Sequence, residues 1–268
     1  MRKPFTAALA IIPFLISCQK EMSSPTDNQR PADAGSGRLV KSVEVWDSQD
    51  SLVTTYEYSN DEKLIAATSL SGWGKIIYHR DLSGRIIQVE KIRNNTTERV
   101  SEVVYADNSS VVNYTLTKAG SSVLDSTAFH YNNGKVVKTE QYLPGTTGFV
   151  INSYNEWSYA ADGNLSNLKV FVRNSNGNIV PNISYDFEYD GKVNPFYSPD
   201  DARIVENWYM VVSPNNLVKQ VNHYEGSGAP DDYVALSYEY GTGNKPFKAA
   251  RSGPAIGTSN VASSFFYE

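Results

Sequence analysis

The sequence predicts an all-β fold, a large curved antiparallel meander of about 16 strands built from consecutive hairpins. From residue 52 onward an aromatic strand end, a polar turn and an aliphatic strand start recur. The chain has 18 tyrosines and only three histidines and three methionines, and aromatic and β-branched residues favour strands. Within strands the side chains alternate, as between Ser184 and Tyr189, which indicates one buried and one wet face.

The recurring phrase has eight copies, each anchored by the aromatic or aliphatic residue before a turn. Neighbouring anchors are 20 to 30 residues apart, which fits two strands of ~8–10 residues and two turns. Consecutive hairpins are expected to lie beside one another, and the sequence leaves open whether the sheet closes into a barrel. The anchors are Tyr58, Tyr78, Tyr105, Tyr131, Tyr159, Tyr189, Val212 and Tyr240.

The residues after the anchors suit tight turns. Asn133-Gly134, Asp162-Gly163 and Asp190-Gly191 are pairs that tolerate the positive φ angles of two-residue hairpins. Only residues 199–206 suggest a helix, because Ser198 could cap it and Pro199 suits its first position. A loop leading into a strand is the alternative there.

The N-terminal sequence predicts that the protein is located in the cell envelope. Arg2 and Lys3 precede an apolar run from Phe5 to Ile16, which is too short to span a bilayer as a helix of ~20 residues. Ser17 then precedes Cys18, the only cysteine, as a cleavage site requires. The arrangement resembles the lipobox of bacterial lipoproteins, in which a signal peptidase cuts before the cysteine and its thiol carries a lipid. An ordinary signal peptide followed by a buried cysteine is the alternative.

Three segments follow from this resemblance. Residues 1–17 are the signal peptide, 18–38 are the lipidated cysteine and a flexible tether rich in Ser, Pro, Asp, Asn and Gly, and 39–268 are one repetitive β domain. The run Gln19-Lys20-Glu21 resembles the charged export signal of surface lipoproteins of Bacteroidota. We therefore expect an outer-membrane lipoprotein, and the sequence leaves open whether it faces the periplasm or the cell exterior.

Charge and residue types narrow the function. Removal of Arg2 and Lys3 leaves 22 basic and 29 acidic residues, a net charge of −7, which disfavours nucleic acid as a partner. Because His79, His130 and His223 lie far apart in the sequence, we expect no metal site and no cofactor. The expected partners are the membrane, through the lipid on Cys18, and a glycan or peptide ligand.

One copy of the phrase carries a family resemblance. Tyr78-His79-Arg80-Asp81-Leu82-Ser83-Gly84-Arg85-Ile86 resembles the YD repeat of RHS and teneurin-type proteins, although Arg80 replaces the usual second tyrosine. With the lipobox, the run from Tyr189 to Phe196 and the closing Phe265-Phe266-Tyr267, the chain is similar to Bacteroidota lipoproteins of unknown function. That resemblance implies a porin-like antiparallel β domain over residues 39–268, and it carries no activity or site residues.

The charged residues between apolar strand positions predict a wet outer face, because a lipid-facing strand needs an apolar outward row. We therefore expect the barrel-like body to lie outside the bilayer. The charged residues in question are Glu57, Lys63, His79, Arg85, Glu102, Lys135, Glu140, Lys169, Glu188 and Glu239.

Candidate binding residues are the tryptophans Trp73, Trp157 and Trp208, whose rings could stack on sugars or apolar ligands or could instead fill the core. The sequence favours a non-enzymatic binding or scaffold protein and indicates no catalytic residue. One alternative is a glycan hydrolase using paired carboxylates among Glu57, Glu188 and Glu239. A structural subunit of an envelope complex is another.

Overall fold

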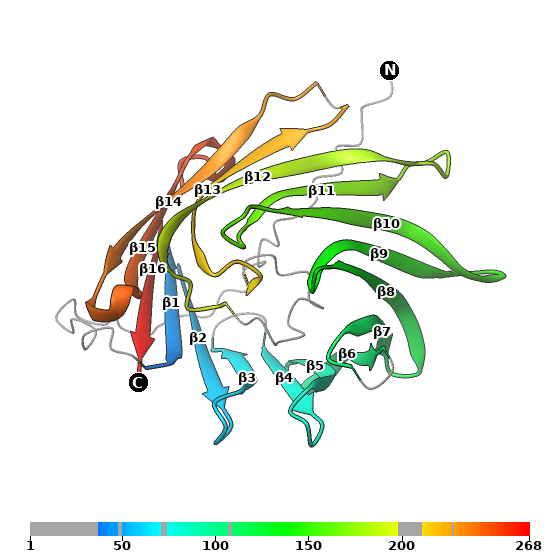
Figure 1. Ribbon diagram of the computed structural model, residues 1–268, viewed down its shortest axis with the longest axis horizontal. Helices are drawn as coiled ribbons and strands as arrows, with labels where there is room; N and C mark the ends of the chain where they lie inside the picture. Colours follow the sequence, from blue (N-terminus) through cyan, green and yellow to red (C-terminus); the bar gives the residue numbers. More distant parts are fainter. Residues whose placement is uncertain (1–36, 48–49, 71–73, 107–108, 198–210, 227) are drawn as a thin grey trace.

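The computed structural model describes residues 37–47, 50–70, 74–106, 109–197, 211–226 and 228–268. Sixteen antiparallel strands follow one another in chain order, and the first pairs with the last to close a barrel (Figure 1). The predicted all-β meander is confirmed, and the structure adds its closure. The strands are β1 (Leu39–Trp46), β2 (Asp50–Tyr58), β3 (Leu64–Ser69), β4 (Lys75–Arg80), β5 (Ile86–Arg93), β6 (Thr96–Tyr105), β7 (Val112–Ala119), β8 (Ser122–Asn132), β9 (Lys135–Gly145), β10 (Gly148–Tyr159), β11 (Leu165–Arg173), β12 (Ile179–Val193), β13 (Asn215–Tyr224), β14 (Asp232–Tyr240), β15 (Pro246–Ser252) and β16 (Val261–Tyr267).

Two short 3-10 helices, η3 (Thr242–Asn244) and η4 (Pro254–Ile256), complete the described elements. The helix considered over residues 199–206 lies outside the described residues, and so does Cys18.

One end of the barrel, which we call the hairpin rim, gathers the turns that follow the even-numbered strands β2 to β14 and both ends of the described chain. A register shift lies at or near the end of each of these seven strands, directly before Tyr58, Arg80, Tyr105, Tyr131, Tyr159, Tyr189 and Tyr240. Such bulges bend a strand and re-aim the side chain. The repeat predicted from the sequence therefore corresponds to a repeated backbone feature, a bulge at or near the end of every even-numbered strand up to β14.

The side chains at these bulges reach back along the barrel wall. Tyr58 donates to the carbonyl of Leu39 at 2.8 Å, and Tyr105 donates to that of Ile86 at 2.8 Å. In β16, the hydroxyl of Tyr267 likewise donates to the carbonyl of Pro246. Each acceptor is the first residue of the preceding strand, so the hydroxyls tie adjacent strands together at the rim.

Two details of the predicted repeat were wrong. The anchor of the second copy is Arg80 rather than Tyr78, and its guanidinium donates to the Leu64 carbonyl just as the tyrosines do. The copies at Tyr189 and Val212 also belong to one connection, because β12 continues through the expected turn at Asp190-Gly191 to Val193. Seven rim turns therefore join the strands from β2 to β15 in pairs, and the terminal strands β1 and β16 complete the sixteen.

The barrel closes at the junction of the two chain ends. Lys245 donates through Nζ to the carbonyl of Gly37, and the Arg38 guanidinium forms an ion pair with the Glu268 carboxylate at 2.5 Å. Farther along the same seam, Arg251 on β15 donates to Glu44 on β1 at 2.6 Å. These contacts join residues more than 200 positions apart, which explains why the sequence alone could not show that the barrel closes.

Candidate functional site on the inward face

Successive strand residues point alternately into and out of a closed barrel. Buried side chains occupy one of the two sets, which therefore faces inward. Nearest the hairpin rim this inward face carries a collar of apolar and aromatic residues, and beyond it a belt of hydroxyl and amide side chains. The collar includes Tyr78, Val103, Phe129, Trp157, Phe187 and Phe265, and the belt includes Thr54, Thr117, Thr127, Gln141, Ser153, Asn155, Gln220, Asn222 and Ser263.

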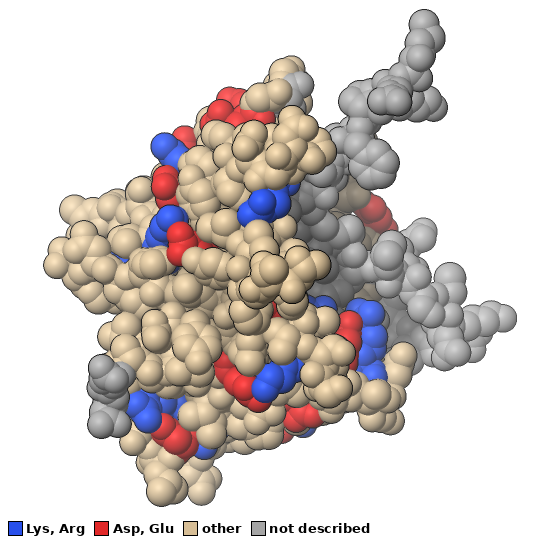
Figure 2. Space-filling model, turned by 90° about the vertical axis from the view of Figure 1, so that its right-hand side faces the viewer, with Lys and Arg blue, Asp and Glu red and all other residues tan. Residues whose placement is uncertain are grey.

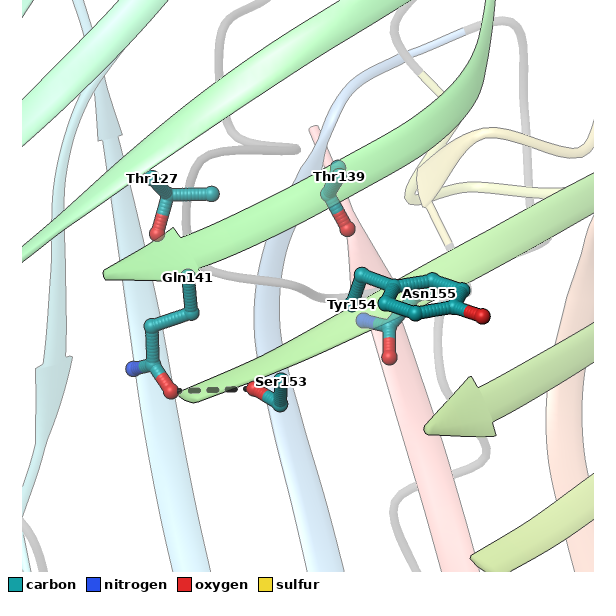
Figure 3. Close-up of a pocket in the computed structure, with 6 residues that line it drawn as sticks. All are labelled: Thr127, Thr139, Gln141, Ser153, Tyr154 and Asn155. Atoms are coloured by element: carbon teal, nitrogen blue, oxygen red, sulfur yellow. Dashed lines mark hydrogen bonds between the residues drawn. The ribbon is translucent and has the colours of Figure 1, made fainter. Parts of the chain in front are cut away.

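The belt contains a small polar cavity on β8, β9 and β10 (Figure 3). Thr127 comes from β8, Gln141 from β9 and Ser153 from β10, and the Ser153 hydroxyl donates to the Gln141 amide oxygen at 3.2 Å. The cavity volume is about 30 Å³. This is room for water and too little for a sugar ring. Its remaining lining residues are Thr139, Tyr154 and Asn155.

The chemistry of this cavity is hydrogen bonding, because hydroxyls and amides line it and none of its six residues is acidic or basic. The cavity therefore offers donors and acceptors to a small polar group.

Of the three tryptophans predicted to bind a ligand, one lies in the core and two lie outside the described residues. Trp157 is 3% exposed, and its indole N–H donates to the Thr139 hydroxyl at 3.4 Å, just below the polar cavity. In this conformation its ring has no free face for a ligand and fills the collar instead. Trp73 and Trp208 lie outside the described residues, so their binding role stays a prediction.

The carboxylates weighed for hydrolysis lie on three separate strands of the outer face. Glu57 is paired with Lys75, and Glu188 is paired with Lys219. Glu239 lies opposite Lys248 in the register of β14 and β15. Each carboxylate therefore has a basic neighbour, whereas a glycosidase needs two carboxyl groups that face each other across a bond.

The three histidines also lie on the outer face, each beside a carboxylate. His79 contacts Glu90 at 3.2 Å and His130 contacts Glu140 at 2.9 Å, whereas His223 lies between Asp231 at 2.7 Å and Asp186 at 3.0 Å. The two carboxylates raise the pKa of His223, and the hydrogen bond to Asp231 has the larger effect. Within the described ranges, no group of three or more His, Cys, Asp or Glu residues could hold a metal ion.

Ion pairs run around the outside of the barrel, mostly between strands. Glu140 on β9 is the best-connected acid, since it accepts hydrogen bonds from Lys138, His130 and Tyr142. These donors, led by Lys138, lower the pKa of Glu140 to about 2. The outward pairs are Glu57–Lys75, His79–Glu90, Glu102–Lys118, His130–Glu140, Lys138–Glu140, Glu188–Lys219 and Asp186–His223. Figure 2 shows the same mixing on one face, where blue and red groups lie side by side.

Not every charged residue expected on the wet face lies there. Lys63, Arg85 and Lys135 are at the hairpin rim, where each donates to a carbonyl of the next turn, namely Gly84, Ser109 and Gly163. A depression of about 440 Å³ between two of these turns is lined by Ser83, Arg85, Ser109 and Ser110. Among the described residues that line it, Arg85 alone is charged, and it is already bound to Asp81, which makes this depression a poor anion site.

The sequence reasoning missed a feature of the β9–β10 hairpin, which reaches farther out than the hairpins beside it (Figure 1). Its end exposes Leu143, Phe149 and Val150. The 15 residues 141–155, between Glu140 and Glu156, include no charged residue. That gap, in a chain of which 20% of the residues are charged, was the available signal.

Comparison with known proteins identifies the fold and no more. No family model matches the chain, and no curated protein does. The structure is similar to a porin-like protein from Bacteroides vulgatus, with a TM-score of 0.52 and 10% sequence identity over 87% of this chain and 99% of that one. A porin-like protein from Bacteroides uniformis covers 86% of this chain and 98% of its own, at 9% identity and a TM-score of 0.40.

The first of these similarities confirms the porin-like fold that the sequence resemblance implied. The second is too weak to support an argument. Among the described residues, no helix is long and apolar enough to cross a membrane.

Proposed function

We propose that this protein is a lipid-anchored binding or scaffold protein of the bacterial envelope, with its barrel standing outside the bilayer. The observation that carries the proposal is the set of outward ion pairs between strands. Glu102 on β6 and Lys118 on β7, for example, pair at 2.7 Å. A charged side chain on a lipid-facing barrel surface costs about 2–4 kcal/mol at the bilayer midplane, and this wall presents charges on most of its strands.

Two further observations support the envelope location. The lipobox-like sequence before Cys18 would attach a lipid there and leave residues 19–38 as a tether. The Bacteroides vulgatus protein with this fold is described as porin-like. We extend that description to location and not to pore formation, because the inward collar is filled with buried side chains such as Trp157 and Phe187.

A protease site inserted between Ser24 and Pro25 tests this arrangement directly. In isolated outer membranes, cleavage should release the barrel into the soluble fraction, whereas a barrel that spans the bilayer would stay in the pellet. The Cys18→Ser variant is the matched control, and it should lose incorporation of labelled palmitate and remain in the supernatant when membranes are pelleted. Retention of the cleaved barrel after an alkaline carbonate wash, which removes peripheral contacts with lipid, would overturn the proposal.

We propose a glycan or a peptide as the ligand class, with Trp73 and Trp208 as the residues to test. The polar belt supports a hydrogen-bonding ligand, although its cavity of about 30 Å³ would admit only a small group of that ligand. A glycan array probed with the released barrel tests the first class. Absence of binding by a barrel whose circular dichroism is intact would exclude glycans and leave peptide or envelope-subunit partners.

A further inference from the structure

We propose that the end of the β9–β10 hairpin is a lipid-contacting tip that dips into the surface of a membrane. We define the tip as residues 143–150. This contact is separate from the lipid on Cys18. The tether from Cys18 enters the barrel at the hairpin rim, where β1 begins, whereas the tip lies at the opposite end of the barrel. It also does not depend on the identity of any ligand.

The tip is a two-stranded extension beyond the barrel wall. β9 and β10 pair with each other from Gly145 and Gly148 inward. The last β9 residue paired with β8 is Tyr142, and the first β10 residue paired with β11 is Ser153. Neither β8 nor β11 therefore pairs with residues 143–150. The outer backbone edges of these residues have no neighbouring strand.

Both faces of this extension are apolar. Leu143 and Val150 are opposite each other in the register, and Phe149 is opposite Pro144. Phe149 is 51% exposed. A half-exposed phenylalanine beside the turn of a hairpin is unfavourable in water unless something apolar covers it.

Polarity changes along the hairpin in the order that a membrane surface presents. Behind the turn at Thr146 and Thr147 come the apolar Leu143, Phe149 and Val150, then Tyr142 on β9, and then the charged Glu140 and Lys138 on the same strand. The Tyr142 hydroxyl donates to Glu140 at 2.9 Å, so the tyrosine joins the apolar and the charged levels. Tyrosine favours the boundary between acyl chains and head groups, with apolar residues on one side and charges on the other.

A lipid surface fits the tip better than a protein does. Three exposed side chains of this size offer on the order of 200 Å², well below the ~800 Å² per partner of a standard protein interface. Lipid requires no matching shape, and the charge-free tip meets no repulsion from lipid head groups. The unpaired backbone edges limit the depth, because backbone groups without partners are costly in the hydrocarbon core. The contact is therefore shallow and lies in the interfacial region.

A local fluorescent label tests the contact. In the full chain carrying Cys18→Ser, a single cysteine at Thr147→Cys at the tip or at Ser83→Cys at the hairpin rim takes an environment-sensitive dye. The probe is vesicles of phosphatidylcholine and phosphatidylethanolamine. The dye at position 147 should shift to the blue and be quenched by lipids carrying a quencher near the head group, whereas the dye at position 83 should not.

Matched variants make the test specific. Phe149→Asp and Leu143→Asp should each reduce the response at position 147 at least tenfold. Leu82→Asp replaces a fully exposed leucine at the hairpin rim and should leave the response unchanged. Circular dichroism of each variant confirms folding. An unchanged dye at position 147 on vesicles would overturn the proposal. So would an equal response in Phe149→Asp, or a shift that follows protein concentration without vesicles, which would indicate self-association instead.

Discussion

Tyr105 donates its hydroxyl hydrogen to the backbone carbonyl of Ile86, 2.8 Å away, and so links the last residue of β6 to the first residue of β5. The Arg85 guanidinium lies over the same ring at 4.8 Å. This unit of a strand-end tyrosine, a strand-start carbonyl and the basic residue directly before that strand start recurs around the hairpin rim. Tyr58 and Tyr267 have the same arrangement with Arg38 and Lys245.

Tyr105→Phe should destabilise the protein by about 1–2 kcal/mol, because it leaves a carbonyl in the barrel wall without its donor. Urea unfolding followed by circular dichroism measures the change. Tyr114→Phe is the matched control, since Tyr114 is an exposed residue of the outer face, and its effect should stay within about 0.5 kcal/mol. Equal effects of the two substitutions would show that the rim hydroxyls contribute nothing particular.

The Arg251–Glu44 pair at the barrel seam should contribute more than an ordinary surface pair. Both side chains are partly buried, at 30% and 19% exposure, and the contact is 2.6 Å. A double-mutant cycle with Arg251→Met and Glu44→Gln should give a coupling of about 1 kcal/mol.

The Lys75–Glu57 pair supplies the comparison for that cycle. It is more exposed and its contact is longer, at 3.4 Å, so the same kind of cycle should give about 0.3 kcal/mol. A coupling at the seam no larger than this would contradict a role for Arg251 in closing the barrel.

His223 should make stability depend on pH above the ordinary histidine range. Both ring nitrogens face carboxylates, and only the protonated ring can donate to both. Because the pKa of His223 is raised above 6.5 in the folded state, its contribution is complete below 6.5 and is lost as the pH rises through the raised value.

NMR titration of the histidine ring protons measures this pKa directly. Denaturant midpoints between pH 6 and pH 9 should fall more steeply in the unaltered protein than in His223→Gln, while Asp231→Asn should bring the pKa back toward 6.5. A His223 titration at or below its ordinary value would refute the two-carboxylate clamp.

Gly74 should tolerate no side chain. Its φ is +96°, and an added Cβ would lie 2.0 Å from the carbonyl oxygen of Ile92, so Gly74→Ala combines backbone strain with a clash against backbone. We expect a loss of more than about 2 kcal/mol in urea unfolding. Gly120 has φ +57° and open space around it, and Gly120→Ala should cost about 1 kcal/mol. A smaller loss at Gly74 than at Gly120 would show that the β3–β4 turn adapts to the added carbon.

The repeat was readable because bulge, turn and strand start are local features. Asn133-Gly134 sits in a tight turn with both φ angles positive, as the residue types require. Local rules failed where a distant part of the chain decided the outcome. Asp190-Gly191 has turn chemistry and yet lies within β12, since Asn215 of β13 pairs with Val193 beyond it.

The candidate site was less predictable than the fold. Trp157 has the residue type of a stacking platform, and only its neighbours on adjacent strands show that it fills the collar. Arg80 looked like a departure from the repeat, whereas its guanidinium reaches the same kind of carbonyl as a tyrosine hydroxyl. Side-chain chemistry was visible in the sequence, and the partner of each group was not.

The amino-acid sequence by itself determined the strand-rich fold, the order of the hairpins and the wet character of one strand face, because period, turn residues and charge are properties of neighbours in the chain. The tertiary structure alone decided that the sheet closes, which strand face turns inward, and that one hairpin outreaches the others. These depend on pairings between residues as far apart as Glu44 and Arg251, and the free energy of such pairings is set by geometry that no local pattern records.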